Sequence, residues 1–402
     1  MRTPYLNDGD VRLYLGDCIE VMAEMDGESV QTCVTSPPYW GLRDYGEARQ
    51  IGQEPTPREY VARMVKVFRE VRRVLRRDGT LWLNLGDCYA ADRGGSHQPA
   101  ETLAGGVSGR MPDGATSNRG RSNGYTPSRN ARAFGLKHKD LVGIPWRVAC
   151  ALQDDGWYLR SDIIWCKPNP MPESVTDRPT RAHEYLFLLT KSARYFYDAE
   201  AVQEPLVSTP EQYLRARKSV RDNHHLGAVA GRPLGPLSFA TVPEGRNARS
   251  VWTIATKTYA GAHFATFPPE IPGRCIKAGT PEAGCCAACG ALRQRVIVAT
   301  SPDGRSAEMP LMGDDMIDHG PRGLWNSGGA TLKPGPARFR ASCDCDAGTV
   351  ASTVLDPFSG SGTTAFVART LARRAVGIDL STDYLGLAAD RLKQLSLFGG
   401  AA

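Results

Sequence analysis

The chain has 402 residues, of which 41% are hydrophobic and 23% charged, enough for one large domain or two ordinary ones with a core of normal size. No apolar run approaches the roughly 18 residues that a membrane span needs, and the first residues lack the apolar stretch of a signal peptide. These features argue against an integral membrane protein, so we expect a cytoplasmic protein with no membrane partner. The formal net charge of +6 is compatible with a polyanionic partner.

Short apolar runs alternate with helical patterns along the chain, which is typical of a parallel sheet with crossover helices. The strands that we expect are 12–15, 32–35, 80–85, 158–165, 184–189, 353–355 and 375–378. Apolar residues spaced three and four apart predict a helix from about Arg58 to Arg76, which Asp78-Gly79 ends. Further helices are expected at 146–153, 365–373 and 383–395. The pattern predicts a doubly wound, mostly parallel α/β sheet of about seven strands.

The motif Ser36-Pro37-Pro38-Tyr39 directly follows the second expected strand. Two prolines hold the backbone extended and leave carbonyls that no helix consumes. The Ser36 hydroxyl and the Pro37 carbonyl are therefore able to accept two hydrogen bonds from an amino group, and Tyr39 offers an aromatic face on which a base can stack. A proline-rich turn that only closes a strand is the alternative reading. Trp40 fits either a pocket wall or the core.

Positive charge is concentrated in one stretch of the chain. Between Arg93 and Lys139 there are eight Lys or Arg against two acids, Glu101 and Asp113, so this stretch carries +6, as much as the whole chain. Segment 92–135 is also rich in glycine and has no regular period, so we expect a mobile loop. A solvated linker and a clamp on a nucleic-acid backbone are both compatible with its composition.

Eleven cysteines, an odd number, argue against a disulfide framework. Cys286 and Cys289 form a Cys-x-x-Cys-Gly turn, and Cys343 and Cys345 follow after a gap of 53 residues. Two closely spaced pairs are what a tetrahedral zinc site requires, so segment 284–348 is a candidate zinc ribbon with these four cysteines as ligands. Free thiols are the alternative, and Cys285 is a further candidate ligand.

A glycine-rich turn, Asp356-Pro357-Phe358-Ser359-Gly360-Ser361-Gly362-Thr363, lies between an expected strand and an expected helix. Its two glycines allow a ligand to approach the backbone where a side chain would block it. Asp379 ends the next strand, 19 residues after Gly360, at a spacing that suits an acid holding ribose hydroxyls. Since no G-x-G-x-x-G is present, a single nucleoside ligand is favoured over a dinucleotide.

Together the two motifs resemble the amino-methyltransferases, DNA enzymes that methylate cytosine N4 or adenine N6. An early Ser-Pro-Pro-Tyr motif and a late glycine turn are the order of the β group of that family. Further pieces that match that group are 15–17, 81–87, 165–169, 183–186 and 262–268. The resemblance implies the S-adenosyl-L-methionine-dependent methyltransferase fold, that cofactor, and double-stranded DNA as partner. The catalytic positions that it implies are Ser36, Pro37, Pro38 and Tyr39. The cofactor-binding positions that it implies are Asp17, Phe267, Asp356, Phe358, Gly360, Gly362, Thr363 and Asp379.

The resemblance also divides the chain into segments. These are a catalytic half at 1–198, a candidate target-recognition region at 199–254, a return segment at 255–283, the cysteine-bearing insert at 284–348 and a cofactor-binding half at 349–402. Many enzymes of this kind belong to restriction–modification pairs, so a cognate restriction endonuclease is a further partner to consider.

Ser36 decides which base we expect to be methylated, because the resemblance associates Ser at this position with cytosine-N4 enzymes and Asp with adenine-N6 enzymes. The target must leave the duplex to reach a bound methyl donor. The Ser36 hydroxyl is then expected to accept from the amino group while donating its own hydrogen to the neighbouring ring nitrogen. Adenine N6, an RNA or protein amino group, and a DNA-binding relative without catalysis remain as alternatives.

Overall fold

The computed structural model describes residues 2–42, 45–47, 49–90, 135–207, 209, 211–212, 245–257, 267–300, 306–310, 333–334 and 338–398. Apart from Gly135, the expected mobile loop 92–135 lies outside these residues, as does the larger part of segment 199–254. The chain forms two compact units. The first comprises Met1–Tyr195, Ser250–Ile276 and Ser352–Ala402, and the second comprises Phe196–Arg249 and Lys277–Ala351.

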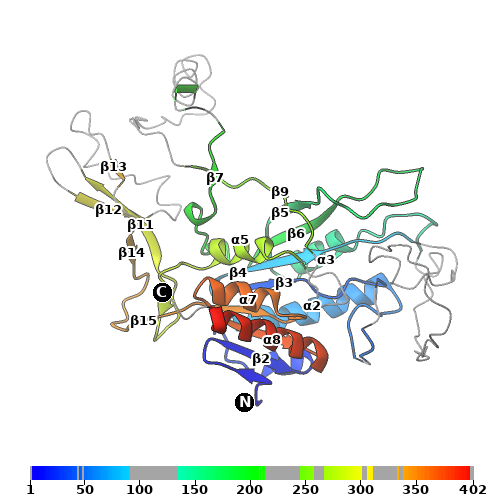
Figure 1. The fold of residues 1–402 in the computed structure, drawn as a ribbon, viewed down its shortest axis with the longest axis horizontal. Helices are drawn as coiled ribbons and strands as arrows, with labels where there is room; N and C mark the ends of the chain where they lie inside the picture. Colours follow the sequence, from blue (N-terminus) through cyan, green and yellow to red (C-terminus); the bar gives the residue numbers. More distant parts are fainter. Residues whose placement is uncertain are drawn as a thin grey trace. The chain divides into compact units, whose positions relative to one another are not determined.

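The first unit is built on a nine-stranded mixed sheet in the order β1-β2-β17-β16-β3-β4-β6-β5-β9 (Figure 1). The strands are β1 Leu6–Asn7, β2 Val11–Leu15, β3 Val30–Thr35, β4 Leu75–Leu85, β5 Tyr158–Cys166, β6 His183–Thr190, β9 Val251–Thr253, β16 Thr353–Asp356 and β17 Arg374–Asp379. Neighbours from β2 to β4 are parallel, and β6 is antiparallel to both β4 and β5. All seven predicted strands are present. The predicted number of strands is too low, because β1 and β9 are too short to show a pattern of alternating residues.

The helix predicted from Arg58 to Arg76 is α2, Pro57–Val74. It begins where the Thr56 side chain accepts from the Glu59 amide, with proline in the first turn. It ends earlier than predicted, because Leu75 is extended and opens β4. Gly79 therefore lies inside a strand and does not end the helix. A Cβ at Gly79 would lie 2.8 Å from the Gln31 carbonyl oxygen, so the close approach of β3 requires glycine here.

The crossover helices cover both faces of the sheet (Figure 1). The helices are α1 Cys18–Ala23, α2, α3 Ile144–Asp154, α5 Glu270–Gly279, α7 Thr363–Thr370 and α8 Thr382–Phe398. The chain passes from β16 through α7 to β17, and in the opposite direction from β3 through α2 to β4. Because such crossovers are right-handed, α7 and α2 lie on opposite faces, and the switch point falls between β16 and β3. Among the described helices, none combines the length and the apolar character that a bilayer span demands.

The second unit contains short strands and a small core. Its elements are η3 Glu200–Val202, β7 Glu204–Pro205, β8 Gly245–Arg246, β10 Cys285–Cys286, β11 Gln294–Thr300, β12 Ser306–Pro310, β13 Lys333–Pro334, β14 Arg338–Arg340 and β15 Thr349–Val350. Phe196, Cys285 and Leu292 are buried together. The Arg295 guanidinium pairs with the buried Asp198 carboxylate at 3.0 Å, and this buried pair fixes the start of β11 to the segment before η3.

Candidate active site

Two motifs that are far apart in the sequence meet at the C-terminal ends of β16 and β3. The strands pair in parallel, with Val354 opposite Thr32. At their ends the Thr35 hydroxyl donates to Asp356 Oδ1 over 2.7 Å, although the two residues are 321 positions apart. This edge is the switch point of the sheet, which is where open α/β folds bind their ligands.

The Ser-Pro-Pro-Tyr motif leaves β3 and is fixed to α2. The Tyr60 hydroxyl donates to the Pro38 carbonyl over 3.0 Å. Pro37 is buried, and the other three residues of the motif are half-buried. Trp40, directly after the motif, is only 4% exposed, and its Nε1 donates to the Glu54 carbonyl over 2.9 Å. The sequence allowed Trp40 to be either a pocket wall or a core residue, and the structure shows it in the core.

A hydrogen-bond network holds the Tyr39 and Ser36 side chains. The Tyr39 hydroxyl donates to Glu184 Oε2 over 2.6 Å and lies 3.0 Å from Asn84 Oδ1. The Ser36 hydroxyl lies 3.2 Å from Asn84 Oδ1 and 3.3 Å from the Tyr39 hydroxyl. The Tyr39 ring also rests against Gly86, where a Cβ would come within 2.5 Å of Cε2. Tyr39 is thus held in place at both its ring and its hydroxyl. The sequence had suggested only an aromatic face for stacking.

Sequence reasoning gave no role to three polar residues of this network, Asn84, Glu184 and Lys167. Lys167 Nζ contacts Glu184 Oε1 at 2.5 Å and lies 4.4 Å from the centroid of the Trp165 ring. Burial and the negative charge of Glu184 raise the pKa of Tyr39 well above its ordinary value, so the phenol stays neutral. No local signal marked them, because β4 also contains Arg76, Arg77, Asp78 and Thr80, and Glu184 lies between His183 and Tyr185 in β6.

Asp356 is the last residue of β16 and is buried at this edge of the sheet. Its Oδ1 accepts from the Thr35 hydroxyl and, over 3.1 Å, from the Phe358 amide. The residue is 2% exposed, and burial raises the pKa of its carboxyl to about 6. Asp356 therefore couples the end of β3 to the glycine turn, and its charge is sensitive to pH near neutrality.

Asp379 holds the glycine turn from the end of β17. Its Oδ2 accepts from the Gly360 amide over 2.8 Å, and its Oδ1 accepts from the Ser381 amide over 2.9 Å. A Cβ at Gly360 would meet no atom within 4 Å, so the space beside it is open. The hydroxyls of Ser359 and Ser361 are buried and have no partner among the described residues. The open space beside Gly360 leaves room for a ligand at this turn, whereas the Ser359 hydroxyl faces Gly377 on β17.

Gly362 and Thr363 serve helix packing. Gly362 precedes α7 with φ of +73°, and a Cβ there would lie 2.8 Å from the Ala388 Cβ on α8. The Thr363 hydroxyl accepts from Arg391 Nη1 over 2.9 Å. The sequence suggested that both glycines allow a ligand to approach. In the structure Gly360 faces open space, whereas Gly362 allows two helices to meet.

Asp17 follows β2 and begins α1. Its Oδ1 accepts from the Ile19 amide over 2.9 Å, and its Oδ2 lies 3.1 Å from Arg63 Nη2. The Gly16 amide donates to the Asp379 carbonyl over 2.9 Å, which ties the end of β2 to the end of β17. Asp17 is thus at the same sheet edge as the glycine turn, with its carboxylate already used by a helix cap and an ion pair.

Two phenylalanines were also expected to bind the cofactor. Phe358 is half-buried and packs against the core directly after β16. Phe267 is half-buried in front of α5, where the Pro268 carbonyl accepts from the Ile271 amide over 3.0 Å. Phe358 therefore lies on the glycine turn itself, whereas Phe267 lies at the start of a different helix.

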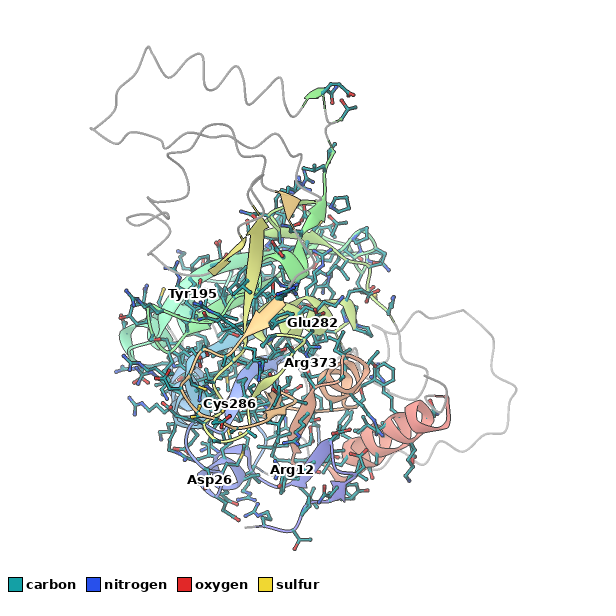
Figure 2. The ribbon with its side chains drawn as sticks, turned by 90° about the vertical axis from the view of Figure 1, so that its left-hand side faces the viewer. Arg12, Asp26, Tyr195, Glu282, Cys286 and Arg373 are labelled. Carbon is teal, nitrogen blue, oxygen red and sulfur yellow. The ribbon has the colours of Figure 1, made fainter. Side chains whose placement is uncertain are left out.

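The second unit brings four cysteines together. The Sγ atoms of Cys286, Cys289, Cys343 and Cys345 all lie within 4.8 Å of one another. Hydrogen bonds from backbone amides lower the pKa of Cys286 to about 7, as a Cys-x-x-Cys-Gly turn favours. Cys285, the further candidate, is buried, and its thiol contacts the Val350 carbonyl at 3.5 Å. Figure 2 labels Cys286 among the side chains of the described residues.

Comparison with known proteins agrees with this arrangement. A family model described as DNA methylase matches residues 30–287 and 348–390. The chain belongs to the DNA methylase family. The resemblance inferred from the motifs is thereby confirmed, and S-adenosyl-L-methionine is the methyl donor of this family.

Several relatives of this DNA methylase align over nearly its whole length. It is 39% identical over 381 residues to the Type II methyltransferase M.XycI of Xanthomonas campestris pv. cyanopsidis, an alignment that covers 95% of this chain and 87% of that protein. It is 36% identical to the Type II methyltransferase M.SmaI of Serratia marcescens, with 95% and 90% covered. The solved PvuII DNA methyltransferase (cytosine-N4-specific) superposes with a TM-score of 0.52 at 15% identity, covering 97% of this chain and 89% of that one. It therefore shares the fold with this DNA methylase.

Proposed function

We propose that this DNA methylase transfers the methyl group of S-adenosyl-L-methionine to the exocyclic N4 of a cytosine flipped out of double-stranded DNA. The observation that carries the proposal is the position of Ser36. Ser36 directly follows Thr35, and the Thr35 hydroxyl donates to Asp356, the first residue of the glycine turn. A hydrogen-bonding hydroxyl at the base position and a ligand site at the turn are therefore neighbours at one sheet edge.

The residues of the chain suit the chemistry of an amino nitrogen. Its lone pair is delocalised into the ring, and acceptors on the amino hydrogens localise that pair toward the methyl group. The Ser36 hydroxyl and the Pro37 carbonyl would be these acceptors, and alignment supplies most of the rate because a sulfonium is an excellent leaving group. Gly360 of the turn and Asp379, which holds it, would bind the methyl donor.

The proposal is tested by the product and by Ser36→Ala. Unmethylated plasmid DNA incubated with the enzyme and labelled S-adenosyl-L-methionine is digested to nucleosides and analysed by mass spectrometry. We expect N4-methylcytosine, and we expect Ser36→Ala to lower kcat about 10-fold or more while leaving the Kd for the cofactor unchanged. N6-methyladenine as the product would contradict the assignment of the base and leave the cofactor site unaffected.

We assign the parts of the chain on the same proposal. Residues 1–198 and 349–402 would form the catalytic and cofactor-binding halves, 199–254 would read the target sequence, and 255–283 would connect the two halves. Relatives of this chain are Type II methyltransferases. By that likeness the enzyme would act in a restriction–modification system beside a cognate endonuclease.

We further propose that the four clustered cysteines bind one structural zinc ion within segment 284–348. Tetrahedral coordination with Zn–S bonds of about 2.3 Å places the sulfurs about 3.8 Å apart. The separations in the structure, all within 4.8 Å, are compatible with that spacing. Cys285 is excluded from the set because its thiol faces the core. Methyl transfer needs no metal, so we assign the ion to the folding of the second unit.

A further inference from the structure

The hydrogen-bond network behind Ser36 has a fixed direction. The Tyr185 carbonyl and the Glu184 carboxylate only accept hydrogen bonds, and both contact the side-chain amide of Asn84, at 3.1 and 3.2 Å. The Asn84 atom that faces them must therefore be Nδ2, and both of its hydrogens are used. Oδ1 is left facing Ser36 and Tyr39, where it only accepts.

Counting the protons in the network then shows to which acceptor the Tyr39 and Ser36 hydroxyls each donate. Lys167 holds Glu184 through Oε1, and Oε2, which also accepts from Asn84 Nδ2, accepts the Tyr39 proton over the short distance of 2.6 Å. Oδ1 of Asn84, 3.2 Å from the Ser36 hydroxyl, is left for the Ser36 proton. Even if Ser36 donates to the Tyr39 hydroxyl instead, at 3.3 Å, its proton stays inside the network. Either arrangement leaves the lone pairs of Ser36 on the side away from the network.

We propose that Asn84 and Glu184 are positioning residues that bind the Ser36 proton, so that Ser36 meets the target amino group as a hydrogen-bond acceptor only. The inference rests on the proposed function, because it concerns the same contact with the amino group. It also corrects the expectation that Ser36 donates to the neighbouring ring nitrogen, since its one proton is already bound. A carboxylate at position 36 would place a second acceptor oxygen against Asn84 Oδ1, with no hydrogen between them. The network therefore favours a hydroxyl at this position.

Glu184→Gln tests the direction of the network. Lys167 only donates, so it would take the new amide oxygen and leave the new amide nitrogen facing Asn84. If Asn84 turned its oxygen toward that nitrogen, the oxygen would also face the Tyr185 carbonyl, and if it did not turn, two amide nitrogens would face each other. Either arrangement loses a hydrogen bond of the network and weakens the hold of Asn84 on the Ser36 proton. We expect kcat to fall about 10- to 100-fold, with the Kd for S-adenosyl-L-methionine unchanged. Glu70→Gln, which removes a carboxylate from a half-exposed ion pair with Arg73 on α2, is the matched control and should leave kcat unchanged.

Rescue separates this role from a merely structural one. Adding Asn84→Asp to Glu184→Gln provides an acceptor beside Ser36, because the new carboxylate takes one hydrogen bond from the amide introduced at position 184 and another from Ser36, while it loses the bond to the Tyr185 carbonyl. The double variant should therefore have a higher kcat than Glu184→Gln alone, whereas Asn84→Asp alone places two carboxylates together and should lower kcat. A double variant slower than both single variants would overturn the inference.

Ser36→Ala distinguishes failure of this inference from failure of the proposed function. The kcat of each variant is measured on unmethylated plasmid DNA, with folding checked by thermal unfolding. If Ser36→Ala lowers kcat and Glu184→Gln then causes no further loss, the inference holds, because both changes act through one hydroxyl. If the Glu184→Gln effect persists in full on the Ser36→Ala background, the positioning inference is wrong while the proposed function stands. If Ser36→Ala leaves kcat unchanged, the proposed role of Ser36 is itself wrong.

Discussion

Gly360 and Gly362 both have positive φ, yet their surroundings differ. Gly360 faces open space at the turn, whereas a side chain at Gly362 would collide with Ala388 on α8. The backbone strain of adding a Cβ is similar at the two positions, about 1–2 kcal/mol. The difference between the two alanine variants therefore isolates the effect of the space around each glycine.

Gly362→Ala should lower the free energy of unfolding by about 1–3 kcal/mol more than Gly360→Ala does, because of overpacking between α7 and α8. Gly360→Ala should instead weaken binding of S-adenosyl-L-methionine, since the added methyl group enters the space proposed for the cofactor. Denaturant unfolding and calorimetric titration measure the two effects. Equal stability losses, or unchanged cofactor affinity in Gly360→Ala, would contradict this assignment.

Asp356 makes stability depend on pH in the direction opposite to most carboxylates. Burial raises its pKa from 3.8 to about 6, so between these values the folded chain binds more protons than the unfolded chain. The free energy of unfolding therefore falls as pH rises from about 4 to about 6, by about 3 kcal/mol from this group. The contribution is fully present below about pH 4 and lost above about pH 6.

Asp356→Asn should abolish this pH-dependent decrease in the free energy of unfolding and leave the variant at least as stable as the parent at about pH 7. The amide oxygen is still able to accept from Thr35 and from the Phe358 amide, so the contacts at the sheet edge survive. Urea unfolding between about pH 4 and about pH 8 gives the two curves. A parallel course of both curves through this range would show that Asp356 does not titrate there.

Hydrogen bonds join the residues on the two sides of segment 91–134, which contains six arginines. The Ala90 amide donates to the Asp140 carbonyl over 2.8 Å, and the Val142 amide donates to the Cys88 carbonyl over 3.0 Å. The Asp87 carboxylate accepts from the amides that open α3. The described residues on the two sides of this segment therefore lie next to each other, close to the end of β4.

Deleting 94–130 should leave cofactor binding intact and weaken DNA binding, because these hydrogen bonds lie outside the deletion. Four arginines are lost, namely Arg110, Arg119, Arg121 and Arg129. Each phosphate contact removed should flatten the slope of log affinity against log salt by about 0.9. The affinity for a DNA duplex is measured at several salt concentrations, and an unchanged slope would mean that these arginines contact no phosphate.

At the scale of the whole molecule, the division into two units predicts separable unfolding. The cysteine cluster lies in the second unit, and the sheet with the Ser36 motif and the glycine turn lies in the first. If zinc stabilises the second unit, removing it should affect one unfolding transition and not the other.

Metal analysis should find about one zinc per chain, and the paired change Cys286→Ser and Cys289→Ser should abolish it. In scanning calorimetry this variant should lose or lower one transition, while the transition that shifts on addition of S-adenosyl-L-methionine keeps its midpoint. Cys275→Ser, a buried cysteine of the first unit, is the control. Metal-free parent protein of unchanged stability would leave the free-thiol alternative standing.

The sequence by itself determined those features that depend on local pattern. Strand and helix positions follow from the spacing of apolar residues, and all seven predicted strands were found. The Ser36 motif and the Asp356 turn were recognisable because prolines and glycines dictate backbone shape at fixed positions. Their order along the chain was enough to indicate the DNA methylase family, which the comparison confirmed.

Only the tertiary structure decided which of those residues face a ligand and which face each other. Asn84 meets Glu184 across 100 positions because β4 and β6 are adjacent, and Gly362 meets Ala388 because α7 packs on α8. Neither contact leaves a local mark in the sequence, since strand order and helix packing are set by which buried surfaces fit together over the whole fold. The hydrogen-bonding direction of Ser36 is a property of that assembly, because its proton is assigned by partners on β4 and β6, two strands other than the one that it follows.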